Sequence, residues 1–120
     1  ELDKVVLPSH LDAVTQVAGT LAVAHVEEME ARVARLVEER GRLLAALREL
    51  PVDVWPSEAN FVLFRPRERS GDEVWKALVE RSVLVRNCSS WPRLDGCLRV
   101  TIGTPAEDDA FLSALREVLT

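Results

Sequence analysis

Apolar residues recur at helical spacing through the first part of the chain. Residues 11–24 are almost uncharged and keep this spacing, which predicts a helix that needs protein on several of its sides. Residues 26–50 form a longer amphipathic stretch, which predicts a second helix that ends before Pro51. On its polar side Glu38 precedes Arg42 at i,i+4 spacing, which favours an ion pair.

After this proline, strand-like runs dominate. Residues 52–55 predict a short strand, and residues 59–64 predict a strand that is apolar on both faces and therefore central in a sheet. Residues 83–86 and 97–102 are two further strand-like runs. Because the connection between them is rich in turn residues, we expect them to form an antiparallel pair.

Two further helices are indicated by capping boxes, in which a hydroxyl residue and a later glutamate satisfy the free amides of a first helical turn. Ser70 and Glu73 form one such pair, and Thr104 and Glu107 form the other. These pairs predict helices over residues 70–81 and 105–119.

The order of these segments predicts an α/β (α+β) fold, with a small antiparallel or mixed sheet of three to four strands covered by helices on one face. A length of 120 residues and a hydrophobic content of 48% suit a single domain with its own core, spanning residues 1–120. The uncovered face of the sheet is left to polar residues of the strands.

Two arginines lie inside the last two strand-like runs, where a cation is normally avoided. Arg99 alternates with Leu98 and Val100, so a strand would send these apolar side chains to one face and the arginine to the other. Arg86 ends the preceding run, and antiparallel pairing would let both guanidinium groups meet one carboxylate or phosphate. The alternative is that both are ordinary arginines on the solvated face of a sheet.

Charge and hydropathy restrict the partners. The formal net charge is -5 and no basic cluster is present, so we expect no nucleic-acid partner. The longest uncharged run, residues 13–26, is too short to span a bilayer and has no basic leader. We therefore expect no transmembrane helix, no signal peptide and a cytoplasmic location.

Groups that commonly carry catalysis or bind metals are few. Cys88 and Cys97 do not have zinc-ligand spacing with the histidines, so we expect no metal site and interpret both as reduced structural thiols rather than a disulfide. His10 and His25 are interpreted as capping or solvent-facing residues rather than general bases.

The lysines and clustered acids add no catalytic group. Neither Lys4 nor Lys76 lies in apolar surroundings that would suit a Schiff base. The acids at residues 107–109 fall in a first helical turn, where they complement the helix dipole. The residues alone thus predict an α/β domain with an anion site and no catalytic residue.

Four segments of the chain carry a family resemblance. Residues 59–61 (ANF), 83–86 (VLVR) and above all 96–104 (GCLRVTIGT) resemble the C-terminal small domain of histidinol-phosphate aminotransferases. Residues 7–11 (LPSHL) are similar to the crossover from that family's large domain. The resemblance therefore places residues 1–25 in a helical crossover segment and residues 26–120 in the small domain.

The resemblance implies a class II, fold-type I enzyme that depends on pyridoxal 5'-phosphate. Such an enzyme exchanges an amino group between histidinol phosphate and 2-oxoglutarate in histidine biosynthesis, and acts as a homodimer. By this resemblance Arg99 holds the terminal anion of the substrate, and Arg86 is a second anion-binding arginine that contacts the phosphate. Asn60 would support the backbone near the site, with structural packing as its alternative role.

Two departures from the family are visible. Ser9 stands where the family usually has an aromatic residue, so a contact made by that ring is in doubt. The lysine that carries the cofactor and the groups that hold its ring and phosphate belong to the preceding large domain in this family. We therefore expect these 120 residues to supply substrate contacts but no catalytic or cofactor-binding residue.

Two alternative functions stay open at this point. A related aminotransferase or decarboxylase of the same fold would share the cofactor and differ around Arg86. A non-catalytic regulatory module that binds a small anion would suit the same capped helices and single sheet.

Overall fold

The computed structural model describes residues 11–120, which divide into two compact units, one ending at Val33 and one spanning Ala34 to Thr120. The sequence predictions about Lys4, Ser9 and His10 fall outside the described residues. The division of residues 1–120 at residue 25 concerns the domains of a parent enzyme and stays a prediction.

The first unit is helical. Helix α1 (Ala13–Ala22) begins at Asp12, whose carboxylate accepts a hydrogen bond from the Thr15 amide at 3.0 Å. A 3-10 turn, η2 (Val23–His25), joins α1 to helix α2 (Val26–Arg48). Since α1 has no buried residue, the unit leaves exposed the apolar side chains that predicted this helix.

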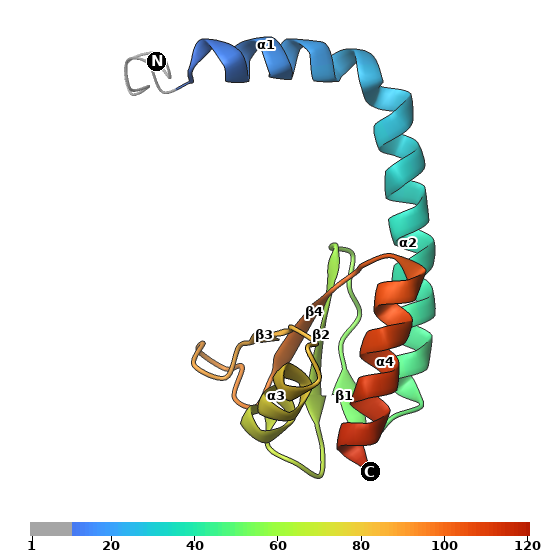
Figure 1. The fold of residues 1–120 in the computed structure, drawn as a ribbon, viewed down its shortest axis with the longest axis vertical. Coiled ribbons are helices and arrows are strands. Elements are labelled where there is room, and N and C mark those ends of the chain that lie inside the picture. Colours follow the sequence, from blue (N-terminus) through green and yellow to red (C-terminus); the bar gives the residue numbers. More distant parts are fainter. Residues whose placement is uncertain (1–10) are drawn as a thin grey trace. The chain divides into compact units, whose positions relative to one another are not determined.

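The second unit contains one antiparallel sheet of four strands, in the order β1-β2-β4-β3 (Figure 1). This arrangement confirms the predicted fold class, with the apolar strand β2 in a central position. The strands are β1 (Val52–Val54), β2 (Phe61–Pro66), β3 (Arg86–Asn87) and β4 (Leu98–Thr101).

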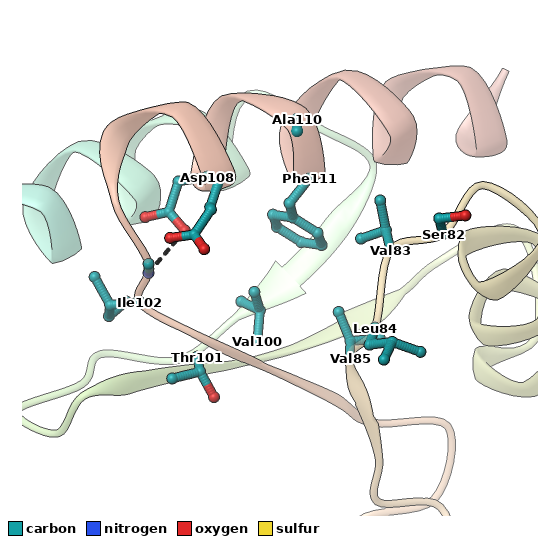
Figure 2. A pocket seen from close by; sticks show the side chains of 12 residues that line it. Ser82, Val83, Leu84, Val85, Val100, Thr101, Ile102, Asp108, Ala110 and Phe111 are labelled. Atoms are coloured by element: carbon teal, nitrogen blue, oxygen red, sulfur yellow. Dashed lines mark hydrogen bonds between the residues drawn. The ribbon is translucent and has the colours of Figure 1, made fainter.

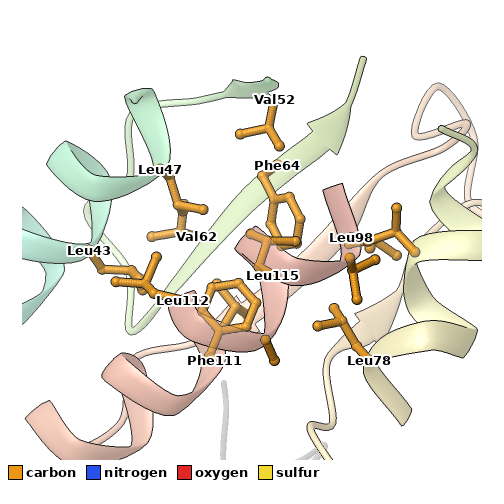
Figure 3. Close-up of a cluster of buried hydrophobic side chains, with 14 of the residues drawn as sticks. Leu43, Leu47, Val52, Val62, Phe64, Leu78, Leu98, Phe111, Leu112 and Leu115 are labelled. Carbon is orange, nitrogen blue, oxygen red and sulfur yellow. The ribbon is translucent and has the colours of Figure 1, made fainter. Parts of the chain in front are cut away.

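One face of this sheet carries the hydrophobic core (Figure 3). Helices α3 (Gly71–Glu80) and α4 (Pro105–Leu119) and the second part of α2 supply its other side. The rings of Phe64 and Phe111 meet edge to face with centroids 5.8 Å apart. The buried residues of this core include Leu43, Leu47, Val62, Leu78, Leu98, Val100, Leu112 and Leu115.

Both capping boxes predicted from the sequence are present. The Ser70 hydroxyl accepts a hydrogen bond from the Glu73 amide, and the Glu73 carboxylate accepts one from the Ser70 amide. Thr104 and Glu107 make the same reciprocal pair at the start of α4. These four residues therefore fix where the two helices begin.

The strand predicted over residues 83–86 is wrong in its extent, because β3 contains only Arg86 and Asn87. Helix α3 provides hydrogen-bond partners for the preceding backbone. The Val83 amide donates to the Leu78 carbonyl at 2.9 Å, and the Val85 carbonyl accepts from Trp75 Nε1 at 3.0 Å. These bonds hold residues 83–85 beside α3 rather than in the sheet ladder.

Candidate anion-binding site

Arg86 and Arg99 are directly opposite each other in the β3–β4 ladder, and Leu63 of β2 is opposite Arg99 on the other side. Directly opposite residues in an antiparallel pair project from the same face. The helix-covered face is occupied by Leu98 and Val100, so both arginines lie on the uncovered face. The structure thus brings together the two residues that the sequence singled out.

Arg99 is held in place by an aromatic ring. Its guanidinium carbon lies 4.8 Å from the centroid of the Phe61 ring, a cation–π arrangement, and the side chain is half-buried. Its Nε atom is buried and has no hydrogen-bond partner among residues 11–120. A buried donor without a partner costs free energy, so an acceptor that reaches this atom would be stabilised.

Arg86 is exposed, and among residues 11–120 neither it nor Arg99 forms an ion pair. Two other arginines, Arg65 of β2 and Arg67 just after this strand, are compensated, since each lies 2.9 Å from a carboxylate oxygen of Asp53. These guanidinium groups hold the pKa of Asp53 below its usual value. The Arg86–Arg99 pair is therefore a place where a bound anion would find two cations without a carboxylate beside them.

Asn60 lies just before β2, at the end of the ladder with β4. Its carbonyl accepts a hydrogen bond from the Ile102 amide at 2.9 Å, and the residue is exposed. The backbone of Asn60 therefore joins the two central strands near the arginine pair. A contribution of its side chain to the site stays a prediction.

The other chemically interesting residues do not join this site. His25 is exposed in the first unit, with Nδ1 4.0 Å from the Glu28 carboxylate. Lys76 is exposed on α3, in the helix layer. Cys88 and Cys97 are buried free thiols, as the sequence predicted.

A second polar cluster was missed by sequence reasoning. The predicted Glu38–Arg42 ion pair is wrong, because Arg42 donates from Nε to both carboxylate oxygens of Glu39 at 3.0 Å and from Nη1 to Asp109 at 2.7 Å. Asp108, beside this pair, is buried, whereas the sequence indicated only an acid that complements the dipole in the first turn of a helix.

The environment of Asp108 changes its titration. Burial, opposed by a hydrogen bond from the Gly103 amide and reinforced by the neighbouring Glu39, raises the pKa of Asp108 to about 6. Arg42 lowers the pKa of Glu39 despite its burial. The sequence contains no signal for this, because Glu39 and Asp108 meet only when α2 and α4 pack.

None of the helices in residues 11–120 is long and apolar enough to cross a membrane.

The sequence model of the family described as aminotransferase class I and II matches residues 1–115 of this chain. Among curated proteins, a histidinol-phosphate aminotransferase from Corynebacterium diphtheriae is 45% identical over 112 residues. That alignment covers 93% of this chain and 29% of the relative. The chain thus spans less than a third of the length of this relative.

Solved structures show the same similarity. The histidinol-phosphate aminotransferase from Clostridium acetobutylicum aligns with a TM-score of 0.74 and 27% identity, covering 78% of this chain and 29% of that one. An L-threonine-O-3-phosphate decarboxylase from Porphyromonas gingivalis aligns with a TM-score of 0.80 and 26% identity, covering 91% of this chain and 34% of that one.

Proposed function

Since this chain belongs to the class I and II aminotransferase family, we propose that it is the C-terminal part of a histidinol-phosphate transaminase. The parent enzyme would exchange an amino group between histidinol phosphate and 2-oxoglutarate, with glutamate as the other partner. The observation that carries the proposal is the cross-strand pair of Arg86 and Arg99 on the uncovered face of the sheet, without a carboxylate partner among residues 11–120.

This pair suits an enzyme that must hold two kinds of anion in turn. A guanidinium group offers a planar fork of donors that fits the two oxygens of a carboxylate or of a phosphate. Arg99 lies over Phe61, and its buried Nε lacks an acceptor among the residues that the structure describes, so we expect it to hold the anion common to both half-reactions. Arg86, exposed across the ladder, would add a second cation where the substrate carries a phosphate.

The family implies dependence on pyridoxal phosphate, which supplies an electron sink when bound. A lysine amine normally holds this cofactor. The single lysine among the described residues, Lys76, is exposed in the helix layer, so these residues do not form the cofactor site. We therefore place that site in the parent outside this chain and expect no transamination from the 120 residues alone.

The rest of the proposal concerns the parent enzyme as a whole. We propose a homodimer in the cytoplasm, acting in histidine biosynthesis, as the similarity to histidinol-phosphate aminotransferases suggests. The exposed apolar side chains of α1 fit this view, because a larger protein would have surfaces to cover them.

The experiment compares single arginine variants of the full-length protein that contains this sequence, with kcat/KM measured for histidinol phosphate and for glutamate. Arg99→Ala should lower both constants about 30-fold to 1,000-fold, or on the order of 2 to 4 kcal/mol, because it removes a charge-assisted contact to a desolvated anion. Arg86→Ala should penalise histidinol phosphate more than glutamate, since phosphate carries more charge. Lysine at either position should recover only part of the loss.

Arg65→Ala is the matched control, because Arg65 lies on the same sheet but is already paired with Asp53. It should leave both constants nearly unchanged. Small and equal losses for Arg99→Ala and Arg86→Ala, comparable to this control, would contradict the proposal and leave these arginines as structural residues.

A decarboxylase of the same fold is the second candidate, favoured by the similarity to the Porphyromonas decarboxylase. The same arginine pair would then hold the phosphate of a phosphorylated amino acid. Assaying the full-length protein for carbon dioxide release and for amino-group transfer separates the two. Release of carbon dioxide without transfer to 2-oxoglutarate would replace the transaminase by the decarboxylase.

A further inference from the structure

A cavity of about 550 Å³ lies between helix α4, the end of β4 and the segment that precedes β3 (Figure 2). Val83, Val85, Val100 and Phe111 form much of its wall, and Asp108 lies at one end. Its size falls within the range of small-molecule sites, which are typically apolar with a few converging polar groups.

The cavity has an identifiable cause in the fold. Val83 and Val85 are tied to α3 by their backbone hydrogen bonds to Leu78 and Trp75, so they do not continue the ladder beside β4. The edge of β4 beyond Arg99 therefore has no strand beside it at the position that a longer β3 would have occupied. The open segment carries apolar side chains, and Leu84 in its middle is 82% exposed.

Asp108 gives this apolar cavity one polar end. Its side chain is buried at 2% exposure, and Oδ1 accepts a hydrogen bond from the Gly103 amide at 3.1 Å. Oδ2 has no donor among the described residues, and the Asp108 carboxyl group is in hydrogen-bonding contact with Glu39, with which it can share a proton when protonated. A buried carboxylate oxygen without a donor costs free energy, so a group that brings an N–H to this oxygen would be stabilised.

The surrounding charges indicate the sign of that group. The charged side chains that act on Asp108 are Glu39 and Arg42 from α2; on its own helix Glu107 also lines the cavity, and Asp109 binds Arg42. Arg42 is already engaged by Glu39 and Asp109. Acids therefore outnumber cations here, which favours a cationic ligand and disfavours an anion.

We propose that this cavity binds a small organic amine, with its ammonium group on Oδ2 of Asp108 and its apolar body against Val85, Val100 and Phe111. This goes beyond the proposed transaminase function, since it uses the helix side of β4 and neither arginine of the pair. A neutral apolar molecule would leave Oδ2 without a donor, and a carboxylate would meet the acids Glu107 and Asp108 that line the cavity.

Protonation of Asp108 should compete with the amine. The pKa of Asp108 is raised to about 6, so a proton occupies the carboxyl group at pH 5 and is lost at pH 8. An alkylamine stays protonated at both values. Because only the ionised carboxylate pairs with an ammonium group, binding should be about tenfold weaker at pH 5 than at pH 8.

The test titrates the 120-residue chain with 2-phenylethylamine and follows its backbone amides by NMR. The neutral 2-phenylethanol and the anionic phenylacetate serve as ligand controls of similar shape. We expect saturable shifts around Val85, Thr101 and Asp108 with the amine, and binding at least tenfold weaker with either control. Absence of saturation with the amine at about 10 mM, or equal binding of the alcohol, would overturn the proposal.

Two variants test whether the amine binds in this cavity. Asp108→Asn should weaken amine binding at least tenfold and remove its pH dependence, while Asp95→Asn, at an exposed position outside this cavity, should change neither. Should Asp108→Asn fail to fold, Ala110→Phe provides an independent answer, because it adds a ring to the cavity from an exposed position on α4. Unchanged binding in the folded variants would show that the amine binds elsewhere and overturn the proposal.

Discussion

The two faces of the sheet differ in how deeply their side chains are buried, although the same strands form both. On the helix-covered face Val62, Phe64 and Leu98 are completely buried. On the uncovered face their neighbours Phe61 and Leu63 are only half-buried, and the Arg99 guanidinium lies over the Phe61 ring. This chain completes one face by itself and leaves the other with apolar and cationic groups available to a partner or ligand.

The comparison separates the face that stabilises the fold from the face that is available for binding. Burial of apolar surface against the helices stabilises the second unit. The uncovered face instead keeps an arginine whose buried Nε has no acceptor in the described part of the chain, a feature that selection for stability alone would avoid. Substitutions on the two faces should therefore have very different effects on folding.

The largest difference is expected from one substitution made on each face of β2. Phe64→Ala removes a completely buried ring that packs on Phe111, and should lower the free energy of unfolding by about 3 to 5 kcal/mol. Phe61→Ala removes a half-buried ring and should cost on the order of 1 kcal/mol. Urea unfolding followed by circular dichroism measures both, and equal losses would contradict the division between the faces.

The fold was predictable where a local signal decides the structure. The pairs Ser70–Glu73 and Thr104–Glu107 predicted where two helices begin. The alternation of apolar and polar residues around Arg99 predicted that its side chain lies on the face opposite the core. The antiparallel pairing of the two arginine strands also followed from local sequence, because their connection is rich in turn residues, whereas the register that sets Arg86 opposite Arg99 came from the structure.

Features set by distant partners were not predictable. Residues 83–85 have strand-forming composition, but Trp75 and Leu78 of α3 provide partners for their backbone. From the sequence Asp108 is an acid that complements a helix dipole, and its contact with Glu39 exists only because α2 packs beside α4. The arginine pair could thus be proposed from sequence, whereas the cavity and its buried carboxyl group required the packed structure.

On the helix-covered side, the buried carboxyl group of Asp108 should make the stability of the chain depend on pH. Since the pKa of Asp108 is raised from 3.8 to about 6, the folded chain holds this proton more tightly than the unfolded chain. The stabilisation is present below about pH 4 and is lost as the pH rises to about 6, by roughly 2 kcal/mol after allowance for screening. Asp108→Asn, whose amide keeps a neutral donor, should not show this loss.

Unfolding free energies of the two proteins at pH 4 and pH 7 test this directly. The lowered pKa values of Asp53, Glu73 and Glu107 make both proteins less stable toward low pH, so their effect cancels in the difference. The variant should gain stability relative to the original chain between these two pH values. A constant difference would show that Asp108 titrates normally.

A smaller effect is expected at the start of α4, which covers the buried face of the sheet. Thr104→Ala removes the hydroxyl that accepts from the Glu107 amide and should lower the free energy of unfolding by about 1 kcal/mol. Thr104→Ser keeps the hydroxyl and should cost only a few tenths of that. Thermal unfolding monitored at 222 nm measures both, and equal losses would exclude the cap as the cause.

The smallest effect is expected on the uncovered face. Arg99→Leu removes the cation–π contact with Phe61 but also removes the buried Nε that has no acceptor, and the leucine retains apolar contact with the ring. These effects oppose each other, so the free energy of unfolding of the 120-residue chain should change by less than about 0.5 kcal/mol. The same substitution in the full-length protein should abolish binding of the substrate anion, measured as a rise in the Kd for glutamate. A large loss of stability in the chain would instead make Arg99 part of its structural framework, and the two faces of the sheet would then differ in exposure alone.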